Sequence, residues 1–85
     1  MQQFDHIVQS PEGIHAKPAM MLAALAKSIR SRVTVSYDGK KADARNIMAL
    51  FTLKANQGAK VTFTVNGHHE IEDLELLKDF CKKNI

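Results

Sequence analysis

The sequence predicts one α+β domain: an open-faced β-sandwich of order β-α-β-β-α-β-α, in which a four-stranded antiparallel sheet carries three helices on one face. Three observations predict this fold. Four short segments alternate apolar and polar residues, as half-buried strands do, and three others repeat apolar residues at helical spacing. The chain has 85 residues, enough for one modest core and too few for a second domain, so residues 1–85 form a single unit.

Turn residues mark where the predicted strands end. The strands are predicted at residues 2–9, 33–37, 40–44 and 61–65. The clearest turn is Asp38-Gly39, a two-residue hairpin signal that joins the second strand to the third. The polar positions of the strands predict a solvent-exposed sheet face rich in hydroxyl groups: Thr34, Ser36, Thr62 and Thr64.

Each predicted helix has an apolar face, and we place the helices at residues 16–30, 47–54 and 69–85. The faces expected to point inward are Ala19, Leu22, Ala23, Ala26 and Ile29; Leu50 and Leu53; and Ile71, Leu74, Leu77 and Cys81. Asn46 is placed to cap the second helix. Acidic residues open the third helix and lysines close it, which complements the helix dipole.

The composition excludes several classes of protein. No apolar run approaches the roughly 20 residues of a membrane helix, and the first residues do not resemble a signal peptide, so we expect a cytoplasmic protein without membrane insertion. Cys81 is the only cysteine, which rules out an internal disulfide and predicts a buried core residue. The net charge of +3 favours acidic protein surfaces or phosphate groups without requiring nucleic acid.

The segment GIHAKPA, residues 13–19, carries the most specific chemistry. If a helix begins just after His15, the free N–H groups of Ala16 and Lys17 and the helix dipole form an anion site beside the imidazole. The same field disfavours the imidazolium, so we expect a neutral ring with a lone pair that can attack phosphorus. The Lys17 ammonium and the two N–H groups would then hold the phosphoryl oxygens, and Gly13 would let the loop approach.

Spacing alone leaves a second interpretation of His15 open, because a histidine at a helix start is often only a capping or surface residue.

The other histidines give weaker signals. His68 and His69 adjoin at a turn and cannot point to one ion, no cysteine pair supports them, and His6 lies in a strand. The sequence therefore predicts no metal and no cofactor.

The chain resembles HPr, the histidine-containing phosphocarrier family of the bacterial phosphoenolpyruvate:sugar phosphotransferase system. GIHAKPA resembles the family's active-site signature, and the length, the order of elements, the segment YDGKKADARNIMAL and the closing helix are similar throughout. The resemblance implies that His15 accepts phosphate at Nδ1 from enzyme I and passes it to the IIA domain of a sugar permease. It also implies that Lys17 stabilises the phosphohistidine and that the protein is a carrier rather than an enzyme.

Three residues depart from the family pattern. Lys17 replaces an arginine and lacks the planar fork that binds two phosphate oxygens, which leaves the rate of transfer open. Asn46 replaces a serine that a kinase phosphorylates in many members, so no seryl regulation is expected there. Lys54 stands where a glycine commonly follows the second helix; we expect a shifted helix end, with Asn56 adopting the positive-φ conformation.

A docking surface is expected around His15 because partners must reach it. Its predicted members are Met20, Met21, Ala24, Lys27, Arg45, Ile47, Met48 and Phe51. The methionines suit a surface that binds unrelated partners, and the two basic residues would attract an acidic one. The alternative is that the apolar members belong to the core and that the charges are simply solvated.

Three functions compete. The first is the phosphoryl carrier that serves enzyme I and IIA domains. The second is a regulatory module of the same fold that docks a transcription factor or enzyme through Met20, Ile47 and Met48 without obligatory phosphotransfer. The third, an RNA-binding α+β domain, is disfavoured because the exposed sheet face offers no aromatic residues for stacking bases. We expect a monomer.

Overall fold

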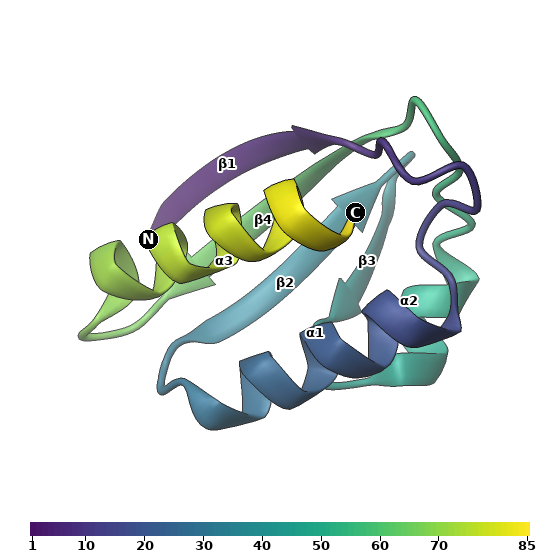
Figure 1. Cartoon of the computed structure of the whole chain (residues 1–85). Coiled ribbons are helices and arrows are strands. Elements are labelled where there is room, and N and C mark those ends of the chain that lie inside the picture. Colours follow the sequence, from purple (N-terminus) through teal and green to yellow (C-terminus); the bar gives the residue numbers. More distant parts are fainter.

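The computed structural model describes residues 1–85 and confirms the predicted order of elements. The elements are β1 (Gln2–Ile7), α1 (Ala16–Ser28), β2 (Arg32–Tyr37), β3 (Lys40–Asp43), α2 (Ile47–Thr52), β4 (Lys60–Asn66) and α3 (Glu70–Asn84). Figure 1 shows α1 and α3 running across the same side of the sheet, with α2 beside the beginning of α1. The architecture is the predicted open-faced sandwich.

The four strands pair antiparallel in the order β1-β4-β2-β3. Phe4 of β1 pairs with Phe63 of β4, Phe63 with Val35 of β2, and Val35 with Ala42 of β3. This row crosses the helix-covered face of the sheet, and the rings of Phe4 and Phe63 stack with centroids 4.9 Å apart. The apolar half of each strand therefore forms the floor of one continuous core.

The Asp38-Gly39 hairpin forms as predicted. Tyr37 and Lys40 are paired, so the loop has two residues, and both adopt positive φ, 51° at Asp38 and 78° at Gly39. These angles define the turn whose twist matches that of the flanking strands. On the opposite, uncovered face, the hydroxyl residues lie at the half-exposed positions that the alternation predicted.

The helices bury most of the predicted residues, with two differences. α1 ends at Ser28 rather than near Arg30, because the next residue, Ile29, is already extended and only partly buried. In α3, the prediction that Ile71 points inward is wrong, since that side chain is exposed. The first turn instead buries Asp73, whose carboxylate accepts hydrogen bonds from the N–H and hydroxyl of Ser31. None of the helices has the length and apolar character to cross a membrane.

Candidate functional site

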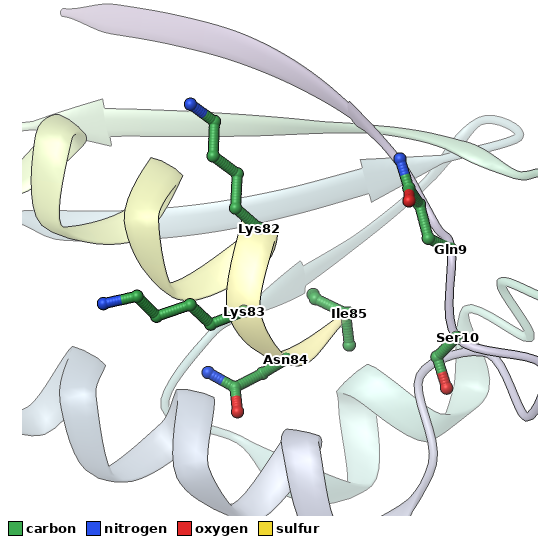
Figure 2. A pocket seen from close by; sticks show the side chains of 6 residues that line it. All are labelled: Gln9, Ser10, Lys82, Lys83, Asn84 and Ile85. Atoms are coloured by element: carbon green, nitrogen blue, oxygen red, sulfur yellow. The ribbon is translucent and has the colours of Figure 1, made fainter.

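The loop between β1 and α1 is held by the end of α3. The N–H groups of Gln9 and Ser10 donate to the backbone oxygen of Ile85 at 2.6 and 3.2 Å. Figure 2 shows that Gln9 and Ser10 lie on the segment opposite the last turn of α3. Together with Lys82, Lys83, Asn84 and Ile85 they line a hollow of about 220 Å³. The start of the loop is thereby fixed to the body of the protein.

The second half of the loop is held by the segment after α2. A turn closes with the N–H of Gly13 donating to the Ser10 carbonyl at 2.9 Å, and Gly13 then adopts φ 70°. The N–H of Ile14 donates to the Ala55 carbonyl at 3.1 Å. A Cβ on Gly13 would lie 2.5 Å from that carbonyl oxygen, so only glycine fits here.

His15 occupies the N-cap of α1 with an extended backbone, φ −99° and ψ −172°. Its side chain makes no capping hydrogen bond and is 33% exposed, so the imidazole is neither packed into the core nor used as a cap. Its carbonyl accepts the Ala19 N–H at 3.0 Å, and Pro18 has no N–H. The N–H groups of Ala16 and Lys17 therefore have no acceptor within the chain, as expected for the first turn of a helix.

Charges of both signs surround the imidazole. Lys17 is exposed in the first turn of α1 and forms no ion pair. Glu12 supplies the negative charge, with its Oε2 atom 3.9 Å from the His15 Nδ1 atom. This contact is not predicted from the sequence, although Glu12 precedes His15 by three residues in a turn. Chemically, the arrangement offers N–H donors that can bind an anion and a ring nitrogen that can attack an electrophile held there.

The predicted docking surface is largely exposed. Met20, Met21 and Met48 have exposed fractions of 59, 40 and 70%, so for them the core alternative is wrong. Ile47 and Phe51 are partly buried and pack against the core. The two remaining members of α1, Ala24 and Lys27, are exposed. Figure 1 shows that α1 and α2, which carry these residues, lie side by side.

Arg45 differs from Lys27, the other basic residue of the docking surface, because it is already paired. Its guanidinium donates to Asp43 from Nε at 3.2 Å and from Nη2 at 2.9 Å, and its backbone N–H donates to Oδ1 at 2.9 Å. The side-chain hydrogen bond from Arg45 lowers the pKa of Asp43, and the same bond raises the pKa of Arg45. Arg45 therefore presents a partly neutralised charge to a partner.

The other candidates carry no site. Cys81 is buried in α3, as predicted, and burial raises the pKa of its thiol to about 12. His68 and His69 lie in the turn before α3. No group of three or more His, Cys, Asp or Glu side chains could hold a metal ion.

Comparison with known proteins decides the family. The family described as "PTS HPr component phosphorylation site" matches residues 2–83. This chain belongs to the PTS-HPr family. HPr proteins are phosphocarriers, not catalytic enzymes, and interact with proteins of the phosphotransferase system.

Solved structures of HPr proteins share this fold. HPr-C-His from Thermoanaerobacter tengcongensis is 29% identical with a TM-score of 0.90, over 96% of this chain and 92% of that one. HPr from Bacillus anthracis is 28% identical with a TM-score of 0.86, over 94% and 95%. Crh of Bacillus subtilis, described as a catabolite repression protein and a swapped dimer, is 33% identical with a TM-score of 0.77, over 100% and 98%.

Two departures from the HPr pattern can be followed in α2. Asn46 caps the helix as predicted, its side-chain oxygen accepting the Ala49 N–H at 3.1 Å. The prediction that Asn56 adopts positive φ is wrong, because Lys54 does so with φ 54°. The helix ends at Thr52, and Lys54 takes the conformation that a glycine would take at this position. α2 thus ends two residues before the predicted end at residue 54.

Proposed function

We propose that the protein is a phosphoryl carrier in which His15 accepts a phosphoryl group from phosphorylated enzyme I and passes it to the IIA domain of a sugar permease. The observation that carries the proposal is the half-exposed imidazole placed directly before two N–H groups that have no acceptor in the chain. Family membership supplies the reaction class, and the free donors supply a physical reason why the phosphate would be held there.

In this proposal, a ring nitrogen of His15 attacks phosphorus and a P–N bond forms, while the bond from phosphorus to the donor breaks. The N–H groups of Ala16 and Lys17 and the Lys17 ammonium bind the phosphoryl oxygens. Because donor complex, transition state and product are all anionic there, one fixed set of donors serves each of them. A lysine contributes a single charge where an arginine would donate two parallel hydrogen bonds.

Partners are proposed to bind the docking surface defined above. Its three exposed methionines provide flexible apolar contact next to His15, and Lys17 and Lys27 favour an acidic partner. Arg45 contributes less to attraction than the sequence alone suggested, since Asp43 holds its guanidinium.

Phosphorus NMR after treatment with phosphoenolpyruvate and enzyme I tests the carrier function. The native protein should show a phosphohistidine signal that is stable in base and labile in acid, and His15→Ala should show none. Lys17→Arg should retain the signal. A folded native sample that takes up no phosphate would contradict the proposal.

A regulatory module is the second candidate, and the similarity to Crh favours it, together with Lys17 and Asn46 at the two positions where HPr carries arginine and serine. Such a protein would dock a transcription factor or enzyme without obligatory phosphotransfer. Binding of a partner that is unaffected by His15→Ala but abolished by Met48→Ala would favour this candidate. Retention of His15 favours the carrier, because docking alone needs no nucleophile.

A monomer is proposed as the working unit. β1 pairs with β4 of its own chain over six residue pairs, so the sheet is complete within one chain. The alternative is a dimer, since solved relatives include an HPr dimer from Thermoanaerobacter tengcongensis and the swapped Crh dimer. Sedimentation equilibrium across a range of concentrations distinguishes the two.

A further inference from the structure

We propose that the Glu12 carboxylate opposes the negative charge of a phosphoryl group on His15, so that the chain gives up its phosphate more readily than a variant neutral at this position. The inference rests on the proposed function for the identity of the phosphoryl group. The contact between Glu12 and His15 is observed in this chain. Binding of inorganic phosphate tests its effect without any phosphoryl transfer.

The charged atoms are close. Glu12 Oε2 lies 3.9 Å from His15 Nδ1, the ring nitrogen to which the resemblance assigns the phosphate. Glu12 is mostly exposed, and its side chain makes no hydrogen bond with another part of the chain. His15 makes no capping hydrogen bond either, so neither side chain is held by another hydrogen bond.

The backbone keeps Glu12 in this place. Residues 10–13 form a turn closed by the hydrogen bond from the Gly13 N–H to the Ser10 carbonyl, with Pro11 restricting φ inside it. Gly13 then reverses the chain with φ 70°, and the bond from Ile14 to Ala55 fixes the far side. The nearness of Glu12 to His15 therefore follows from an anchored loop and does not depend on the side chain alone.

The site thus contains groups that attract an anion and one group that repels it. A phosphoryl group carries close to two negative charges at neutral pH. The N–H groups of Ala16 and Lys17 attract it, and Glu12 repels it. At about 4 Å in water one unit charge opposing another is worth roughly a fivefold change in an equilibrium constant, and screening by salt keeps the total for two charges close to this value.

Release of the phosphoryl group relieves the repulsion. When an acceptor's nucleophile bonds to phosphorus, the P–N bond breaks and its electron pair remains on the ring nitrogen of His15. Glu12 neither donates nor accepts a proton in this step. Its role is to raise the free energy of the phosphorylated state, which favours onward transfer.

The chain offers a matched control. Glu72 Oε2 also lies 3.9 Å from a histidine Nδ1, that of His69. Glu72 follows His69 by three residues, whereas Glu12 precedes His15 by three. Figure 1 shows that α3 begins at the opposite end of the molecule from the beginning of α1. Glu72→Gln therefore makes the same change in net charge and in a Glu–His contact as Glu12→Gln, but away from His15.

The first experiment titrates native protein, Glu12→Gln and Glu72→Gln with inorganic phosphate and follows the NMR shifts of the Ala16 and Lys17 amides. Glu12→Gln should bind phosphate roughly fivefold more tightly than the native protein, with a difference that shrinks as salt is added. Glu72→Gln should match the native protein. Equal affinities in native protein and Glu12→Gln, an equal gain in Glu72→Gln, or no phosphate-dependent shift in Glu12→Gln would overturn the inference.

The second experiment measures the transfer equilibrium with phosphorylated enzyme I. The equilibrium constant for phosphoryl transfer to His15 should rise in Glu12→Gln by about the same factor as phosphate affinity, and Glu12→Asp should restore native behaviour in part. An unchanged equilibrium in Glu12→Gln overturns the inference. If no variant accepts phosphate while the anion affinities still differ as expected, the carrier proposal fails and the electrostatic role of Glu12 stands.

Discussion

The Ala55 carbonyl accepts a hydrogen bond from the Ile14 N–H at 3.1 Å, which ties the segment after α2 to the residue that precedes His15. Both residues are buried, so water does not compete for this bond. The position of the imidazole consequently depends on a connection that is remote in sequence. Substitutions on either side of this contact test how firmly the site is held.

Replacing Gly13 with alanine should destabilise the protein by about 3 kcal/mol, because the new Cβ meets the Ala55 carbonyl and the residue must hold a positive φ. Gly39→Ala separates the two effects, since Gly39 also has positive φ but nothing lies within 4 Å of its added Cβ. That control should lose only about 1 kcal/mol. Urea denaturation measures both, and equal losses would refute the close contact.

Lys54→Gly should stabilise the protein by about 1 kcal/mol. Lys54 has φ 54°, a conformation that glycine adopts without steric cost, while the greater flexibility of glycine in the unfolded chain offsets part of the gain. Lys54→Ala retains the strain and should leave stability close to native. Thermal unfolding compares the variants, and a loss of stability in Lys54→Gly would contradict the assignment of strain.

Asn46→Ala should lower stability by about 1 kcal/mol, because the Ala49 N–H loses its acceptor at the start of α2. Asn46→Asp retains the side-chain oxygen and should keep the native value. The measurement is the free energy of unfolding in urea at neutral pH. Equal losses in the two variants would mean that the cap contributes nothing.

The sequence predicted what nearby residues determine. The Asp38-Gly39 hairpin and the Asn46 cap were recognised because each depends on a few adjacent residues. The strands were recognised from alternation, which one buried face imposes. His15 was recognised from its segment, and the structure places it half-exposed at the beginning of α1.

Features that depend on contacts between distant segments were not predicted. Amide side chains tolerate positive φ better than lysine does, which predicts this conformation at Asn56, yet the structure has it at Lys54. Ile71 was placed inside by its spacing, whereas the hydrogen bonds from Ser31 turn Asp73 inward. The contact between Glu12 and His15 required knowledge of the anchored loop.

The Asp43–Arg45 pair should contribute a small, pH-dependent stabilisation. Because the pKa of Asp43 is lowered in the folded protein, its contribution is present above the unfolded value of about 3.9 and is lost as pH falls through the folded value. Asp43→Asn should lower the urea midpoint slightly near neutral pH, and this difference should shrink as the pH falls below the ordinary range of a carboxyl group. Both side chains are largely exposed, so the loss should be well below that of Gly13→Ala.

Comparing urea midpoints of the native protein and Asp43→Asn across this range checks the assignment. The control is Asp79→Asn, which removes an exposed partner of Lys83 in α3. The Asp79 carboxylate lies 3.0 Å from the Lys83 ammonium and accepts no hydrogen bond from a backbone N–H. A midpoint difference for Asp43→Asn that persists unchanged into acid would contradict the linkage.

Cys81 should make stability fall in alkali. Burial raises the pKa of its thiol from 9.0 to about 12, so above the lower value the unfolded chain releases a proton that the folded chain retains. The unfolded state then binds fewer protons, and stability decreases with rising pH. At about pH 10, the loss attributable to this thiol should be about 1 kcal/mol.

Cys81→Ala removes the titrating group and leaves the other ionisable residues in place. The variant starts from a lower stability at neutral pH because it leaves a small cavity in the core, but it should lose less on passing to about pH 10 than the native protein does. Urea denaturation at the two pH values gives this double difference. Identical alkaline losses of stability in the two proteins would show that the thiol ionises as easily in the folded chain as in the unfolded one. That result would contradict the effect of its burial within α3.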